Sequence, residues 1–133
     1  MSNPYQKYKS TAVTSASREK LLLMMYEGAI KFAKKAVQAC EQKQIAERGM
    51  NIGKTYDIVM ELANTLDHSV GGEISKNLEA LYLYILDQLT KTNISGDPVP
   101  IKNAIKILET LHEGWTGAIE KLKKEDAKHS QDK

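Results

Sequence analysis

The sequence predicts an all-α protein, an antiparallel up-down-up-down four-helix bundle with an N-terminal arm. Three observations predict it. The only prolines are Pro4, Pro98 and Pro100, so no proline interrupts a helix between residues 6 and 97. No sustained alternation of apolar and polar residues, which would indicate a strand, occurs along the chain. The loops between helical stretches hold only about three to five residues, and short loops place successive helices antiparallel.

Local signals set the bounds of the first two helices. Ser17 precedes an apolar run with Glu19 in its first turn. The serine hydroxyl can cap free backbone N–H groups, and an acidic residue suits the positive end of the helix dipole. We therefore expect a first helix over about residues 18–41. A second is expected over about 45–67, ending at a glycine-containing loop, 68–72.

Turn residues separate the last two helices. The third helix is expected over about residues 73–93. The string Ser-Gly-Asp-Pro at 95–98 is typical of a turn, an N-cap and a first helical proline, so the fourth helix is expected over about 98–124. The expected organisation has three parts, which are an N-terminal arm (1–16), the four-helix bundle (17–124) and a polar flexible tail (125–133).

Composition indicates a small globular protein of the cytoplasm. Its 133 residues suffice for one domain with a full core. With 19 basic and 17 acidic residues the net charge is +2, too balanced to predict a nucleic-acid partner. The single cysteine, Cys40, can form no internal disulfide, which fits a reducing compartment. No apolar run approaches the roughly 18 residues of a membrane span, so we predict no membrane insertion.

Helical-wheel positions show more apolar surface than a four-helix core needs. In the first predicted helix, a core stripe that includes Met25 and Ala29 is flanked by a second apolar stripe. Together the stripes span about 220°, whereas a bundle face needs little more than about 100°. The third predicted helix is apolar in nearly every direction over residues 82–86. In the second, further apolar residues lie beside the core stripe that includes Tyr56 and Val59.

Two interpretations of this surplus stay open. Helices of a small bundle can bury broad apolar flanks, or the surplus forms a groove for the N-terminal arm, a second copy of the chain or a foreign amphipathic helix. Helix-interior glycines such as Gly53 and Gly114 fit the close approach of another segment, or a local bend. The predicted partner-binding groove is lined by Leu23, Tyr26, Ile30, Val37, Ile58, Leu62 and Leu83.

The sequence offers little chemistry for catalysis. Glu109 and His112 share a helix face, but a di-iron site needs a second such motif and two further glutamates on the other helices. We therefore predict no enzyme activity, no catalytic residues, no metal site and no cofactor. Phosphotransfer domains are helical bundles with one exposed histidine, so a signalling module that uses His112 is the alternative function, although His112 falls within the apolar arc of its helix.

Short strings spread along the chain occur together in the order and spacing of one known family. They are NPYQKY at 3–8, VTSAS at 13–17, KLLLMMYEGAI at 20–30, GGEI at 71–74 and LYLY at 81–84. With Trp115 in the fourth predicted helix, they resemble the flagellin-specific export chaperones (FliS) over about residues 3–122. The chain departs from the family pattern at Arg18, where a proline is usual, and at Pro98 and Pro100.

The resemblance implies a cytoplasmic chaperone that binds the C-terminal segment of flagellin. Such a chaperone prevents premature polymerisation and aids delivery to the flagellar export apparatus. The expected partners are that segment and a component of the export gate, and a homodimer of this chain stays open. In the family, the N-terminal arm covers part of the empty groove. The matching apolar positions of this chain are Tyr5, Tyr8 and Val13.

Overall fold

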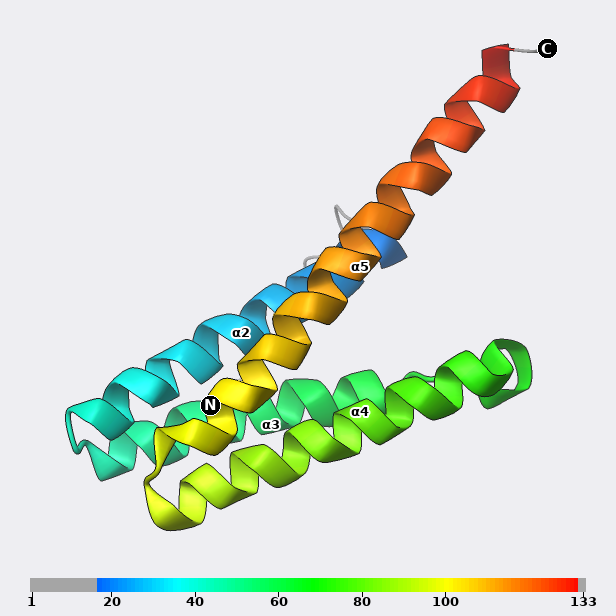
Figure 1. Cartoon of the computed structure of the whole chain (residues 1–133). Helices are drawn as coiled ribbons and strands as arrows, with labels where there is room; N and C mark the ends of the chain where they lie inside the picture. The colour runs from blue at the N-terminus through cyan, green and yellow to red at the C-terminus, as the bar shows by residue number, and fades with distance from the viewer. Residues whose placement is uncertain (1–16, 132–133) are drawn as a thin grey trace.

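The computed structural model describes residues 17–131 and confirms the predicted all-α fold (Figure 1). Its helices are α2 (Arg18–Glu41), α3 (Ile45–Asn64), α4 (His68–Ser95) and α5 (Pro98–Gln131). Helix α2 packs against α3 and α5, and α4 packs against the same two helices, so each helix has two neighbours in a ring of four. Within the described residues, no helix has an apolar stretch long enough to cross a bilayer.

Helix α2 begins and ends where the sequence predicts. The hydroxyl of its N-cap, Ser17, accepts a 3.2 Å hydrogen bond from the backbone N–H of Lys20. After α2 the chain turns over residues 42–44, where Lys43 adopts a positive φ of 57°. This short turn returns the chain along α2 as α3, as the short predicted loop requires.

The junction of α3 and α4 differs from the prediction. Helix α3 already ends at Asn64, and most of the segment expected as a loop, 68–72, forms the first turn of α4. Asp67 explains the early start of α4, because its carboxylate accepts hydrogen bonds of 3.0 and 3.3 Å from two backbone N–H groups of that turn. Gly72, with φ 52° and ψ −121°, then breaks the helix, and the long part of α4 follows it directly, as predicted.

Thr92 holds the turn between α4 and α5. Its hydroxyl donates to the carbonyl of Asp97 at 2.8 Å and accepts from the backbone N–H of Ile101 at 3.0 Å. Gly96 ends α4 in the left-handed region, with φ 78°. The guanidinium group of Arg48 on α3 donates to a carbonyl in the last turn of α4 at 3.2 Å, where a cation suits the negative end of the helix dipole.

Helix α5 is longer than predicted. It starts at Pro98 as expected but continues to Gln131, so residues 125–131 of the expected tail are helical. Its C-terminal part projects beyond the other helices (Figure 1). The side chains of residues 120–128 are all exposed, so this part of α5 buries no side chain against the described part of the bundle.

A hydrogen-bonded group of aromatic side chains lies inside the bundle. Tyr26 of α2 and Tyr82 of α4, 0% and 2% exposed, are hydrogen-bonded through their hydroxyls, and Trp115 of α5 donates to the Tyr26 hydroxyl at 3.2 Å. Burial raises the pKa of both tyrosines above the ordinary value of 10.0. The surrounding core is built from small and aliphatic side chains of the four helices, among them Ala29, Ile52, Val59, Ile85, Leu89, Ile101 and Leu108.

Candidate partner-binding surface

Three residues of the predicted groove lie in the core. Tyr26 and Ile58 are 0% exposed, and Leu62 is 1% exposed. The expectation that these side chains face away from the core is therefore wrong. In a ring of four, each helix packs against two neighbours and also faces the centre, so the buried arc is wider than that of a helix with one contact. This wider arc accounts for much of the apolar surplus seen in the sequence.

The remaining α2 positions of the predicted groove lie at the seam with α5. They are Leu23, Ile30 and Val37, all half-buried. They share a helix stripe with Glu27 and Lys34, which both reach α5. Glu27 Oε1 lies 3.3 Å from His112 Nε2. Lys34 Nζ lies 3.7 Å from Glu109 Oε2. This stripe of α2 therefore faces α5, and Ile30 and Val37 in it also pack against the core.

Leu83 is the residue of the predicted groove that stays open, with 57% of its surface exposed on α4. On α3, Tyr56 and Met60 are 37% and 39% exposed. The sequence placed Tyr56 in the core, but the buried face of α3 is turned toward Ile58 and Leu62 instead. The predicted residues thus form no single groove. The arm residues with a predicted covering role lie outside the described residues: Tyr5, Tyr8 and Val13.

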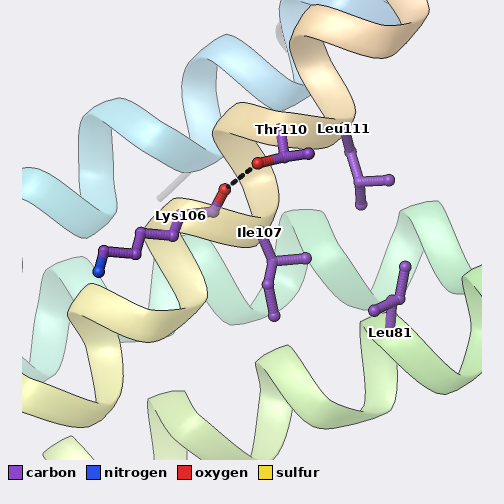
Figure 2. Close-up of a pocket in the computed structure, with 5 residues that line it drawn as sticks. All are labelled: Leu81, Lys106, Ile107, Thr110 and Leu111. Atoms are coloured by element: carbon purple, nitrogen blue, oxygen red, sulfur yellow. Dashed lines mark hydrogen bonds between the residues drawn. The ribbon is translucent and has the colours of Figure 1, made fainter.

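An apolar hollow of about 230 Å³, which sequence reasoning missed, lies between α4 and α5 (Figure 2). Leu81 of α4 and Ile107 and Leu111 of α5 form its apolar walls. Lys106 and Thr110 complete the lining on α5. The Thr110 hydroxyl donates to the Lys106 carbonyl at 2.9 Å, which satisfies this polar group on its own helix. We call this feature the α4–α5 hollow.

A stripe on α5 marks that helix's wall of the hollow, although it does not show which helix faces it. Ile107, Leu111, Gly114 and Ala118 recur at helical spacing beside the core stripe, and the last two are exposed. A Cβ atom added at Gly114 would meet no atom within 4 Å, and the same is true of Gly53. Among the described residues, then, no segment approaches these two glycines closely, and the approach of a partner stays a prediction.

The geometry around His112 does not favour the alternative function. Its Nε2 atom is shielded from solvent and lies 3.3 Å from Glu27 Oε1 without hydrogen-bond geometry. A phosphoryl group carried on this nitrogen would need open space and would be repelled by the carboxylate. In the described part of the chain, no three His, Cys, Asp or Glu side chains gather where they could hold a metal ion.

Comparisons with known proteins agree with the resemblance seen in the sequence. The family model described as flagellar protein FliS matches residues 1–122. The flagellar secretion chaperone FliS of Vibrio cholerae is 33% identical over 119 residues, which are 86% of this chain and 88% of the relative. Its counterpart in Bacillus subtilis is 30% identical over 123 residues, 92% of this chain and 91% of the relative.

The fold is also shared with a solved structure. A crystal structure of a flagellar chaperone from bacteria matches with a TM-score of 0.74 at 20% identity, covering 88% of this chain and 95% of that one. At this identity the likeness shows the fold alone, whereas the sequence matches extend over most of the chain. The sequence matches establish that this chain belongs to the FliS family of flagellar proteins.

Proposed function

We propose that this protein is a cytoplasmic flagellar secretion chaperone that binds the C-terminal segment of flagellin. Family membership carries the proposal, because the relatives in Vibrio cholerae and Bacillus subtilis are named flagellar secretion chaperones. The structure supports it with apolar side chains left open on α3, α4 and α5. They are Tyr56, Met60, Leu81, Leu83 and Tyr84, together with the walls of the α4–α5 hollow.

Such a surface suits a disordered amphipathic segment that folds as it binds. Leu81 and Leu83 are two residues apart and point to different sides of α4, so the segment passes over α4 to cover both Leu83 and the α4–α5 hollow, while its polar face stays in solvent. Ordering the segment costs several kcal/mol, which moderates the affinity and keeps the complex releasable. Met60 adds a flexible side chain that can adjust to its neighbours. Covering the segment in this way keeps it from polymerising.

Delivery is the second half of the proposed role. The chaperone holds the flagellin segment until the subunit reaches the export apparatus, and a component of the export gate is its second partner. When no client is bound, the arm residues Tyr5, Tyr8 and Val13 cover part of the apolar surface. A homodimer through the same surface is the competing arrangement, and sedimentation of the free protein at several concentrations distinguishes it.

The test is titration calorimetry of the full chain with a synthetic peptide of the flagellin C-terminal segment from the same organism. We expect one-to-one binding with a negative heat-capacity change, because the segment buries apolar surface as it folds. The titration is repeated with a chain that lacks residues 1–16, in which the arm cannot compete. Absence of binding by both proteins at several temperatures would contradict the proposed function.

A further inference from the structure

The α4–α5 hollow carries a positive charge at its edge. Lys106 is one of the lining residues, and its side chain leads away from Leu81 toward the start of α5 (Figure 2). Among residues 17–128, no carboxylate forms an ion pair with the Lys106 ammonium group. Glu109, one turn further along α5, is directed to Lys34 of α2 at 3.7 Å. An apolar site and an uncompensated cation therefore lie side by side.

The surroundings of the hollow fit a helix as its occupant. The hollow, at about 230 Å³, has room for a large aliphatic side chain. Along α5, Gly114 and Ala118 are exposed and small, and a Cβ at Gly114 would meet no atom within 4 Å, so a partner backbone can approach closely there. On a helix, residues three or four apart lie about 5–6 Å from each other, a span that the flexible stem of Lys106 can match.

We propose that Lys106 fixes the register of the bound client helix. The α4–α5 hollow takes one apolar side chain of the client, and Lys106 pairs with a client carboxylate one helical turn away, on the side nearer the start of α5. This inference rests on the proposed function, since it names the chemical groups by which the protein recognises the flagellin segment. Sliding the client by one turn would still bury apolar surface but would leave both charges unpaired, so the pair favours one register over its neighbours.

Charge reversal tests this pairing. Lys106→Glu is compared with Lys123→Glu, a control further along α5 that is also exposed, has no ion-pair partner among residues 17–128 and changes the net charge by the same amount. Both are titrated with the flagellin C-terminal peptide and with a peptide series in which each Asp or Glu in turn is replaced by Lys. We expect Lys106→Glu to weaken binding about fivefold, the scale of a partly exposed ion pair, and the loss to shrink at high salt. One peptide of the series should restore the affinity of Lys106→Glu alone.

The outcomes separate this inference from the proposed function. Equal losses in the two variants, unchanged affinity of Lys106→Glu, or failure of every reversed peptide to restore binding would each overturn the role of Lys106 while the wild-type protein still binds flagellin. Absence of binding by the wild-type protein would overturn the proposed function itself. A wild-type dimer that Leu81→Glu converts to monomers would place a second copy in the hollow, and would also overturn the inference.

Discussion

The indole N–H of Trp115 donates a 3.2 Å hydrogen bond to the hydroxyl of Tyr26, which lies 89 residues earlier in the chain. The same hydroxyl is hydrogen-bonded to Tyr82. This polar chain links α2, α4 and α5, and it crosses the ring between α2 and α4, which are not neighbours in it. Buried polar groups that lose their partners destabilise the fold, so these hydrogen bonds favour one relative placement of the three helices.

Removing the hydroxyl of Tyr26 should destabilise the fold more than removing the hydroxyl of Tyr82. Tyr26→Phe leaves both the Tyr82 hydroxyl and the Trp115 N–H without their partner, and we expect a loss of about 2–4 kcal/mol in the free energy of unfolding. Tyr82→Phe leaves Tyr26 bonded to Trp115 and should cost about 1 kcal/mol. When Tyr26→Phe is already present, adding Tyr82→Phe should hardly change the free energy of unfolding, because the Tyr82 hydroxyl that it removes no longer has a hydrogen-bond partner.

Urea denaturation of the two single variants and the double variant measures this coupling. Circular dichroism of each folded variant checks that the helices are retained before the energies are compared. Strictly additive losses would contradict the finding that the two hydroxyls depend on each other.

Alkaline pH should destabilise the protein through Tyr26 and Tyr82. Burial raises the pKa of both phenols in the folded state above the ordinary value of 10.0. Above pH 10 the unfolded chain therefore loses these protons while the folded chain keeps them, so the free energy of unfolding falls as pH rises. Below pH 10 both states hold the protons, and the two phenols contribute no slope.

The measurement is the free energy of unfolding against pH, for the wild-type protein and for Tyr26→Phe/Tyr82→Phe. The double variant should lose less stability above pH 10 than the wild-type protein does. Its tyrosinate absorbance should show two fewer tyrosines that ionise only well above pH 10. Parallel curves for the two proteins would show that other groups cause the alkaline loss.

An acidic residue at Leu83 should weaken flagellin binding without unfolding the protein. Leu83 is 57% exposed, so Leu83→Glu removes little core packing but places a charge where the proposed client would bury apolar surface. We expect a loss of at least about tenfold in affinity by calorimetry. The control is Gln38→Glu, an exposed position on α2 that adds the same charge and should change affinity by less than about twofold. If Leu83→Glu bound flagellin with wild-type affinity, this part of α4 would not belong to the client-binding surface.

Two glycine-to-alanine substitutions should change stability in opposite directions. Gly96 has φ 78°, and a Cβ there would lie 2.6 Å from a guanidinium nitrogen of Arg48. Gly96→Ala should therefore cost about 1–2 kcal/mol through strain, and should displace Arg48 from the Asn93 carbonyl. Gly53 is exposed within α3 with no atom within 4 Å of its would-be Cβ, so Gly53→Ala should gain about 0.5–1 kcal/mol. Thermal unfolding of both variants checks the signs, and a stabilising Gly96→Ala would contradict the conformation at the end of α4.

Helix ends that depend on local signals could be predicted from the sequence. Ser17 and Pro98 mark helix starts through capping and fixed φ, and both predicted starts match the structure. Asp67 caps the first turn of α4, a role that the glycine pair shortly after it conceals in the sequence, because such a pair is typical of a loop. The polar composition after Lys124 also concealed the end of α5, because exposed charged residues can continue a helix without any packing.

The partner surface was harder to predict, because a helical wheel gives angles within one helix and not the directions of its neighbours. Tyr26 and Ile58 lie beside the predicted core stripes, yet both are fully buried. Tyr56 was placed within a core stripe and is exposed. The α4–α5 hollow needs Leu81 and Leu111 to meet across two helices, and no single-helix pattern contains that information.

The C-terminal end of α5 should be dispensable for the fold. Residues 120–128 are exposed, and the family match ends at residue 122. A chain ending after Leu122 keeps Trp115 and the buried Ile119, so its free energy of unfolding should change by less than about 0.5 kcal/mol, as for surface changes elsewhere. A chain ending after Gly114 loses both side chains and the bond to Tyr26, and should be strongly destabilised. Urea denaturation of the two truncated proteins compares them, and a large loss in the longer one would mean that the projecting helix packs against the bundle after all.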